Sequence, residues 1–381
     1  MKSKRTILII PSWFDVTENT PFGIFFKEQA ISLIEDNNVI FLYFNYSKSH
    51  TKRYNIYRKN NLTYFIINIK PYFKLGLISL IVLSIYYFIK FNLKKKVHIV
   101  HAHSIFSAGL VGYIYKILFK KPYLITEHHT KYLNYNKRYF MFLIEKLIVK
   151  NANVLIAVSG SLSNRLESIF SKSKWNTINN MVNPKFLNHK IEKKINNNFI
   201  ITTTALLTSK KNINLLIDAF GLLSKNDDNI FLNIIGDGPD KLMLESLAIK
   251  HNIDHLIQFH GNLKDFEIIE ILQNSDIFVL PSKIETFGIA IIEAMSLGLP
   301  VIVTKSGGPE TYVNESNGIV IEPDNIDQLY KALLKLKLEH KNYNSKNIKN
   351  YISNNFSSSI ISNKITKMYH NIYENHYNFR R

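Results

Sequence analysis

The stretch that decides the fold is residues 276–304, DIFVLPSKIETFGIAIIEAMSLGLPVIVT. It begins with an apolar run of strand length, DIFVLP, and passes through a polar turn, SKIET. It continues as a segment of helix length, FGIAIIEAMSLG, which Gly298 is expected to end, and then enters a second apolar run, PVIVT. Apolar strands separated by helices are typical of a parallel sheet buried on both faces.

The same alternation runs through the whole chain. Strand-length apolar runs in the first half are TILIIP, NVIFLYF, LTYFIINI, HIVHAH, PYLITEHH and NVLIAVS. In the second half they are FIITTTA, IFLNIIG, IQFHG, DIFVLP and PVIVT. The pattern predicts two doubly wound, Rossmann-like α/β domains facing a central cleft.

Domain boundaries follow from composition. Residues 188–198, NHKIEKKINNN, are polar and lack periodicity, which predicts a linker between domains at 1–187 and 199–355. A last amphipathic helix within 356–381 is expected to pack back toward the first domain.

Composition narrows the class of protein. The chain has 381 residues, of which 46% are hydrophobic, so it can bury two cores. It has no cysteine, which excludes disulfides and Cys-ligated zinc and fits a reducing, cytoplasmic compartment. The start, MKSKRTILIIPSWFD, lacks an apolar region of signal-peptide length, so a first buried strand is predicted there.

Charge is divided unequally along the chain. Residues 1–190 hold 28 Lys and Arg against 8 Asp and Glu, whereas residues 191–381 hold 20 against 21. Between Asp36 and Glu127 there are 14 basic residues and no acid. A basic first half predicts an anionic partner, either a membrane surface or nucleic acid. No recognised nucleic-acid-binding module is present, which favours the membrane surface.

A helix is predicted over Leu75–Ile89, inside the acid-free stretch. Its uncharged run of 15 residues is shorter than the about 20 residues that a membrane-spanning helix needs. Two other interpretations stay open. The helix packs between the sheet and the surface, or it lies in the bilayer interface, anchored by Lys90 and Lys94–Lys96.

Two glutamates mark the candidate site. Ligands of parallel sheets bind beyond the carboxyl ends of the strands, which places Glu285 at the cleft, just before a helix N-terminus. Amides there favour an anion such as phosphate, and Gly288 lets a ligand approach the backbone. Glu293 lies about two turns into the helix, so the pair suits two contacts along one extended ligand. Alternatively, Glu285 only caps the helix.

These residues resemble a known family. ETFGIAIIEA followed by GLPVIVTKSGG is similar to the E-x7-E signature of retaining glycosyltransferases of the GT-B fold, family 4. TPFGIFFKEQA, HIVHAHS, LITEHHT, LLTSKKNINLLIDAF and IIGDGPDKLML resemble further motifs of that family, in the same order. The resemblance implies that Glu285 binds the donor sugar and Glu293 the ribose. It also implies that backbone amides of Phe287, Gly288 and Ile289 hold sugar and phosphate.

Further roles are implied by the same resemblance. Lys211 matches the lysine that neutralises the donor diphosphate, and Gly23 matches the glycine loop at that diphosphate. His128 matches the histidine near the transferred sugar, with His129 as the competing assignment. His101 and His103 are given no catalytic role; one is expected to face the core and the other the cleft edge.

The chain departs from the family pattern at one phosphate ligand. The usual arginine is replaced by Leu206, and Lys210 either substitutes for it or does not. The prediction is a retaining transferase that moves a hexose-type sugar from a UDP- or GDP-linked donor to a saccharide or lipid-linked saccharide. Cell-surface polysaccharide synthesis at the inner face of the membrane is the expected setting. No metal or other cofactor is expected, and transfer is expected at the front face, with the leaving phosphate accepting the proton.

Three alternatives remain. A sugar-nucleotide epimerase would need more acid and base groups in the cleft, and a nucleic-acid-binding protein would need a recognised module. A catalytically weak or inactive family member that acts as a nucleotide-sugar-binding subunit is the third.

Overall fold

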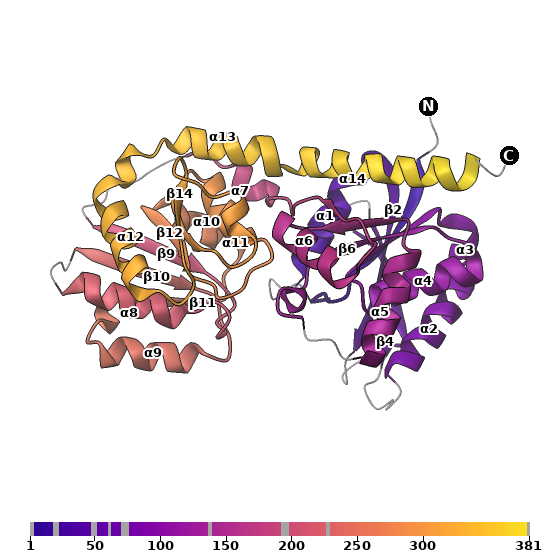
Figure 1. Ribbon diagram of the computed structural model, residues 1–381, viewed down its shortest axis with the longest axis horizontal. Helices are drawn as coiled ribbons and strands as arrows, with labels where there is room; N and C mark the ends of the chain where they lie inside the picture. Colours follow the sequence, from indigo (N-terminus) through magenta and orange to yellow (C-terminus); the bar gives the residue numbers. More distant parts are fainter. Residues whose placement is uncertain are drawn as a thin grey trace. The chain divides into compact units, whose positions relative to one another are not determined.

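The structure is a computed structural model, and it describes residues 4–17, 23–46, 52–59, 62–69, 76–135, 139–191, 198–225 and 229–378. Its internal contacts divide the chain into two compact units. The first unit comprises Met1–Asn179 together with Ser358–Arg381, and the second comprises Asn180–Ser357. Figure 1 shows that each unit is built on one sheet with helices packed against it.

The described part of the first unit contains an eight-stranded sheet in the order β3-β4-β2-β1-β5-β6-β7-β8. Its strands are β1 (Arg5–Ile10), β2 (Asn37–Tyr46), β3 (Tyr54–Lys59), β4 (Leu62–Ile69), β5 (Ile99–His103), β6 (Tyr123–Glu127), β7 (Val154–Ala157) and β8 (Asn176–Thr177). All neighbouring pairs are parallel except β3 and β4, which are antiparallel. Each apolar run predicted in this half forms a strand. The order changes direction between β1 and β5, which makes this the switch point of the sheet.

Helices cover the sheet of the first unit. They are α1 (Ile24–Ser32), α2 (Gly76–Lys90), α3 (Leu93–Lys96), α4 (Ala108–Phe119), α5 (Tyr139–Asn151), α6 (Gly160–Ile169) and α14 (Ser358–Tyr373). Helix α4 packs against both α2 and α5, whereas α14, yellow in Figure 1, packs against α1 and β5. Because crossovers between parallel strands are right-handed, the helices on the two sides of the switch point lie on opposite faces.

The described residues of the second unit form a six-stranded, fully parallel sheet in the order β11-β10-β9-β12-β13-β14. Its strands are β9 (Phe199–Thr204), β10 (Ile230–Ile235), β11 (Ile257–Gly261), β12 (Ile277–Leu280), β13 (Val301–Thr304) and β14 (Gly318–Ile321). Its helices are α7 (Pro184–Asn188), α8 (Ile213–Ser224), α9 (Lys241–Lys250), α10 (Asp265–Gln273), α11 (Ile289–Ser296), α12 (Ile326–Glu339) and α13 (Ser345–Phe356). The switch point lies between β9 and β12.

The opening stretch folds as predicted. DIFVLP contains β12, FGIAIIEAMSLG contains α11 and PVIVT contains β13. Gly298 follows the helix with φ of 86°, and its N–H donates to the Met295 carbonyl at 2.9 Å. This left-handed conformation is why glycine ends the helix.

The boundary between the units differs from the predicted one. Residues 180–187 were predicted to belong to the first domain, but they bond to the second unit. The Val182 N–H donates to the Phe356 carbonyl at 2.8 Å, and the Asn183 amide donates to Asp265 at 3.2 Å. Of the predicted linker, 188–198, residues 192–197 lie outside the described residues.

Helix α2 has one buried face and one exposed face. Leu80, Ser84, Tyr87 and Phe88 are buried, whereas Ile78, Val82, Tyr86 and Ile89 are each more than half exposed. The exposed positions therefore form an apolar stripe, where an ordinary surface helix carries polar side chains. Within the described ranges, no helix combines the length and apolar character needed to cross a bilayer.

The packing of α14 on the first unit can be tested at Ile365, which is buried at 1% exposure. Ile365→Ala should lower the free energy of unfolding by about 2–5 kcal/mol, because it removes buried methyl groups and leaves a cavity. Asn363→Ala, on the exposed side of the same helix, is the control and should change it by less than about 0.5 kcal/mol. Denaturant unfolding measures both, and equal stability of the two variants would contradict this packing.

Candidate active site

The second unit brings predicted site residues together at its switch point. Lys211 lies in the loop after β9, and Glu285 lies in the loop after β12, the strand that pairs with β9. Each loop leads into a helix, α8 or α11, whose N-terminus lies at the carboxyl edge of the sheet. Two helix N-termini and a lysine therefore meet at the edge where parallel sheets bind ligands, which makes this edge suited to an anion.

Lys211 and Glu285 form an ion pair between Nζ and Oε2. The side chain of Glu285 is 12% exposed and that of Lys211 is 25% exposed, so the pair is only partly in contact with solvent. The Glu285 N–H donates to the Ser306 carbonyl at 2.9 Å, which fixes the loop against the segment after β13. Both side chains were predicted at the site, but their mutual contact was not.

A glycine and a tyrosine fix the backbone at the start of α11. Gly288 has φ of 87°, and the Tyr312 hydroxyl donates to the Phe287 carbonyl at 2.5 Å. Gly308 packs so tightly that a Cβ there would lie 2.4 Å from the Thr286 carbonyl oxygen. These contacts fix the backbone just before α11, whose first amides, including that of Ile289, have no acceptor within the helix.

Glu293 lies within α11, one turn beyond its start, and is half-buried, whereas Ile292, Ala294 and Met295 beside it in the sequence are buried. Its carbonyl accepts a hydrogen bond from the Ser296 hydroxyl at 2.7 Å. Glu285 precedes the helix, so the two glutamates are separated by less than eight residues of helical rise. The structure thus places both carboxylates on one continuous turn-and-helix element.

A solvent-exposed leucine stands where the family pattern has a phosphate-binding arginine. Leu206 is 57% exposed and Lys210 is exposed as well. The Lys210 carbonyl accepts the Lys283 N–H at 2.8 Å, which ties the loop after β9 to the loop after β12. Lys283 in turn pairs with Asp324 at 2.9 Å. Lys283 was not singled out from the sequence, although it stands only two positions before Glu285.

The first unit has its own cluster at the carboxyl ends of β1, β5 and β6. The Ser12 hydroxyl donates to the His103 carbonyl at 2.5 Å, and the Ser107 hydroxyl donates to Ser12 at 2.9 Å. Ser104 and Ser107 have φ of 99° and 48°, values that non-glycine residues rarely adopt. Strained backbone of this kind concentrates at functional sites.

Gly23 begins α1 beside this cluster. It has φ of 77°, and a Cβ there would lie 2.5 Å from the Trp13 carbonyl oxygen, so a larger residue is excluded. The part of the predicted glycine loop that precedes it, residues 20–22, lies outside the described residues. Trp13 was not singled out from the sequence; its ring lies 4.3 Å from that of His129 between centroids.

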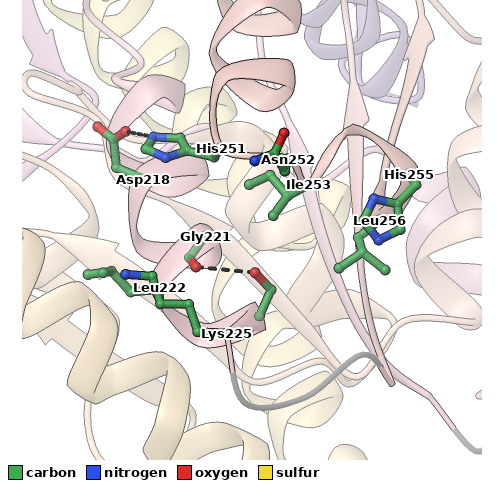
Figure 2. A pocket seen from close by; sticks show the side chains of 10 residues that line it. Asp218, Gly221, Leu222, Lys225, His251, Asn252, Ile253, His255 and Leu256 are labelled. Carbon is green, nitrogen blue, oxygen red and sulfur yellow. Dashed lines mark hydrogen bonds and ion pairs between the residues drawn. The ribbon is translucent and has the colours of Figure 1, made fainter.

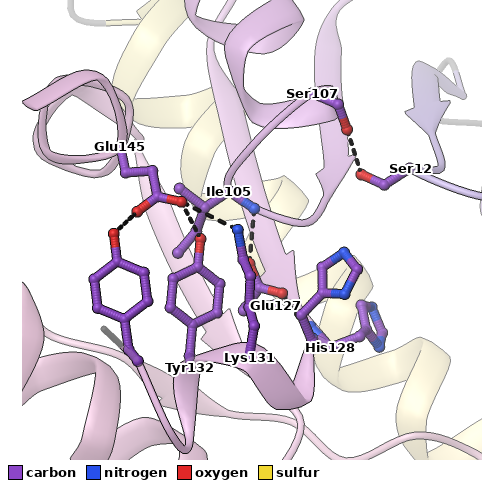
Figure 3. A network of polar contacts seen from close by, with 10 residues as sticks. Ser12, Ile105, Ser107, Glu127, His128, Lys131, Tyr132 and Glu145 are labelled. Atoms are coloured by element: carbon purple, nitrogen blue, oxygen red, sulfur yellow. Dashed lines mark hydrogen bonds and ion pairs between the residues drawn. The ribbon is translucent and has the colours of Figure 1, made fainter. Parts of the chain in front are cut away.

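Glu127 organises the loop that carries the candidate histidines (Figure 3). One carboxylate oxygen accepts the N–H groups of His128 and His129, each at 2.8 Å, and the other accepts that of Ile105 at 2.8 Å. Burial raises the pKa of Glu127 to about 7, against the lowering effect of these N–H donors and of Lys131. The carboxylate thus joins the loops after β5 and β6. Glu127 lies in the sequence motif LITEHHT, but only the histidines of that motif were predicted as site residues.

A second carboxylate fixes the segment after His129. Glu145 of α5 is buried, accepts the Tyr132 hydroxyl at 2.9 Å and pairs with Lys131 at 3.1 Å (Figure 3). The Tyr135 hydroxyl donates to its other oxygen. The loop that begins with His128 is therefore held at both ends.

The prediction for His101 and His103 was wrong. Both side chains are fully buried, and their rings stack at 4.2 Å between centroids. Alternate residues of a strand point to the same face, so one histidine cannot face the core while the other faces the edge. His128 Nε2 lies 3.1 Å from His103 Nδ1, and His128 is buried whereas His129 is half-buried. The choice between His128 and His129 stays a prediction.

A cavity of about 300 Å³ lies elsewhere in the second unit (Figure 2). It is lined by the end of α8 and by residues 251–256, and the Asp218–His251 pair spans 2.8 Å at its side. These segments lead into the amino ends of β10 and β11, the edge of the sheet opposite to Glu285. Across the described ranges, no cluster of three or more His, Asp or Glu side chains could hold a metal ion.

Comparison with known proteins defines the class. Residues 30–186 match the family model described as Glycosyltransferase Family 4, and residues 185–354 match that described as Glycosyl transferases group 1. The UDP-Gal:alpha-D-GlcNAc-diphosphoundecaprenol alpha-1,3-galactosyltransferase of Escherichia coli is 30% identical over 309 residues, which are 75% of this chain and 78% of that protein.

Two solved structures are similar over nearly their full length. Sucrose-phosphate synthase from Thermosynechococcus elongatus has a TM-score of 0.79 at 17% identity and covers 97% of this chain and 99% of its own. Anabaena HepE in complex with UDP-glucose has a TM-score of 0.75 at 16% identity and covers 96% and 99%.

The fold is therefore GT-B, and the protein is a glycosyltransferase. The chain belongs to the family of group 1 glycosyl transferases, with a family 4 domain in its first half.

The raised pKa of Glu127 predicts how stability depends on pH. The folded protein holds this proton more tightly than the unfolded chain, whose glutamate titrates near its ordinary value of 4.5. The contribution of Glu127 is therefore fully present below that value and is lost as the pH rises through about 7. Glu127→Gln cannot titrate, so the wild type should lose stability relative to this variant between pH 5 and pH 8. Thermal unfolding across that range measures the difference, and parallel curves would contradict the assignment.

Proposed function

We propose that the protein is a retaining, metal-independent transferase that moves a hexose from a UDP- or GDP-linked donor to a saccharide or lipid-linked saccharide. The observation that carries the proposal is the Lys211–Glu285 ion pair at the switch point, beside the N-terminus of α11. A cation and helix amides suit a diphosphate, and a neighbouring carboxylate suits the hydroxyls of an attached sugar.

Donor binding exchanges one set of partners for another. When the donor binds, its diphosphate pairs with Lys211 in place of Glu285. Glu285 then accepts hydrogen bonds from the sugar hydroxyls. Glu293 binds the ribose. Cleavage of the sugar–phosphate bond develops negative charge on the leaving phosphate, which Lys211 and the amides of Gly288 and Ile289 stabilise. Since Leu206 replaces the family arginine, Lys211 carries a larger share of this charge.

The retaining course is proposed to proceed at the front face of the sugar, with the leaving phosphate accepting the proton of the acceptor. A double displacement would need a carboxylate nucleophile near His128. Glu127 is adjacent in sequence, but it is fully buried and its two oxygens accept three backbone N–H groups. This engagement supports a positional role for Glu127 and favours the front-face course.

The acceptor is proposed to lie at the inner face of the cell membrane. The similar Escherichia coli enzyme is named for an acceptor on diphosphoundecaprenol, a lipid carrier. In this chain the apolar stripe of α2 is followed directly by Lys90 and by Lys94–Lys96 of α3. Lys90 Nζ lies 4.6 Å from the ring centre of Tyr54, so its charge is held beside aromatic surface. Apolar side chains flanked by lysines suit an anionic bilayer interface.

The two glutamates should have separable effects on ligand binding. Glu293→Ala should raise the Kd for UDP or GDP about 10-fold or more, because hydrogen bonds to a charged group contribute about 1.5–3 kcal/mol. Glu285→Ala should leave that Kd unchanged or lower it, because Lys211 loses its partner, but should weaken the intact donor and turnover. Calorimetry with nucleotides and nucleotide sugars measures this, with the exposed Glu339→Ala as control. Wild-type affinity in both variants would refute the roles, and donor binding without turnover in the wild type would favour an inactive binding subunit.

Membrane docking should depend on charge. The protein should bind vesicles that contain anionic lipid, bind neutral vesicles weakly, and dissociate as salt screens the lysines. Replacing Lys90, Lys94, Lys95 and Lys96 by Gln should weaken binding at least 10-fold, since each lysine near the surface contributes about 1 kcal/mol. Four Lys→Gln changes in the second unit, at 225, 250, 331 and 335, are the matched control and should change little. Indifference to anionic vesicles at low salt would overturn the docking proposal.

A further inference from the structure

The loop after β13, residues 305–313, supports the segment that carries Glu285. The Ser306 carbonyl accepts the Glu285 N–H at 2.9 Å, which fixes the first residue of that segment. Gly308 packs against the carbonyl of Thr286, the next residue, and leaves no room there for a side chain. The two loops therefore contact each other at consecutive residues on the way to α11.

Tyr312 extends this support to the start of α11. Its hydroxyl lies 2.5 Å from the Phe287 carbonyl oxygen and 3.3 Å from the Gly288 carbonyl oxygen. The side chain is buried, and its ring packs against those of Phe287 and Phe356, with centroids 5.2 Å and 5.5 Å away. Burial, and after it the nearby carboxylates, raise the pKa of Tyr312 well above its ordinary value. The hydroxyl therefore stays protonated and acts as a donor.

The two carbonyls belong to the peptide units that contain the first amides of α11. These peptide units are trans, and the C=O and N–H groups of a planar trans unit point in opposite directions. Because Tyr312 holds the Phe287 carbonyl, the Gly288 N–H of the same unit points away from Tyr312. The Ile289 N–H is fixed in the same way through the Gly288 carbonyl. Within the ranges that the structure describes, neither N–H donates to a backbone or side-chain acceptor.

The amides of Gly288 and Ile289 are suited to a ligand with several acceptor oxygens, such as a diphosphate. Gly288 is buried, and buried N–H groups without a partner are rare in native proteins. We propose that Tyr312 is a positioning residue for the nucleotide sugar: its hydroxyl holds the carbonyls of Phe287 and Gly288, so that the amides of Gly288 and Ile289 meet the diphosphate in a fixed direction. The diphosphate rests on the proposed function, whereas the hold on the backbone does not.

Tyr312→Phe tests the hydroxyl, because it keeps the ring and removes only the donor. The ratio of the Kd for UMP to that for UDP, or of GMP to GDP, measures what the second phosphate adds to binding. Tyr312→Phe should lower this ratio at least about 5-fold, because a hydrogen bond to a charged group weakens when it is misaligned. A residue that only stabilised the fold would leave the ratio unchanged, since both ligands bind the same folded protein. Tyr351→Phe, in the same aromatic cluster, is the control and should keep the ratio within about twofold of the wild type.

An NMR signal can report on the Gly288 amide itself. The sequence contains three Phe-Gly pairs, at residues 22–23, 220–221 and 287–288. Full-length protein labelled with ¹³C-carbonyl phenylalanine and ¹⁵N-glycine therefore gives only these amides in a carbonyl–nitrogen correlation, and the signal missing in Phe287→Leu belongs to Gly288. In the wild type this signal should shift when UDP or GDP is added. In unliganded Tyr312→Phe it should differ from the wild type, because the peptide unit has lost its donor, while thermal unfolding shows whether that variant is folded.

Different results exclude different claims. A folded Tyr312→Phe variant with a wild-type Gly288 signal, or with a wild-type ratio of the two Kd values, overturns the positioning role. Nucleotide binding that leaves the Gly288 signal of the wild type unmoved overturns the contact between these amides and the diphosphate, and this titration needs no variant. If the wild type binds neither UDP nor GDP, the proposed function fails. The Gly288 signal of unliganded Tyr312→Phe then still decides whether Tyr312 holds the backbone.

Discussion

Both sheets are buried on their two faces by helices, and this constraint determines where chemistry can occur. A parallel strand inside such a sheet carries apolar side chains on both sides, so polar groups emerge where the strand ends. At a switch point the loops of neighbouring strands diverge and leave room for a ligand. In the first unit this point lies between β1 and β5, and in the second between β9 and β12. Every candidate site residue lies in or just beyond a loop at the carboxyl edge of one of these sheets.

The charged groups at the carboxyl edges of the two sheets are stabilised in different ways. In the second unit a lysine and a glutamate pair with each other while partly exposed, so each stabilises the charge of the other. In the first unit the corresponding groups are almost completely buried, and burial shifts their pKa values toward neutral forms. The second unit therefore keeps a charged pair close to solvent, as the proposed binding of a charged nucleotide requires. The first unit instead holds buried groups that hydrogen bonds orient.

The unequal charge of the chain is consistent with this division. The basic first half contains a helix, α2, whose inner face packs into the core and whose outer face is apolar. A helix of this kind is stable in the folded protein because only its inner stripe needs a protein partner. Lysines follow the stripe immediately, whereas the second unit is nearly neutral overall.

The local pattern of the sequence determined the α/β class, most of the strands and the place of Glu285, Gly288 and Lys211 at strand ends. These features depend on periodicity and turn chemistry within short windows, which a sequence displays directly. Strand β3 was missed because an edge strand that is half exposed and charged lacks the continuous apolar signal. Strands β8 and β14, which are only two and four residues long, were also missed.

Tertiary structure alone decided the contacts between residues far apart in the chain. Lys211 meets Glu285 across 74 positions, and Tyr369 meets His101 across 268. Strand order and helix packing bring such residues together, and no local pattern encodes either. The boundary between the units also differed from the predicted one. Residues 180–187 show no periodic pattern of apolar side chains that would assign them to either unit. Their hydrogen bonds to Phe356 and Asp265 decide which core they join.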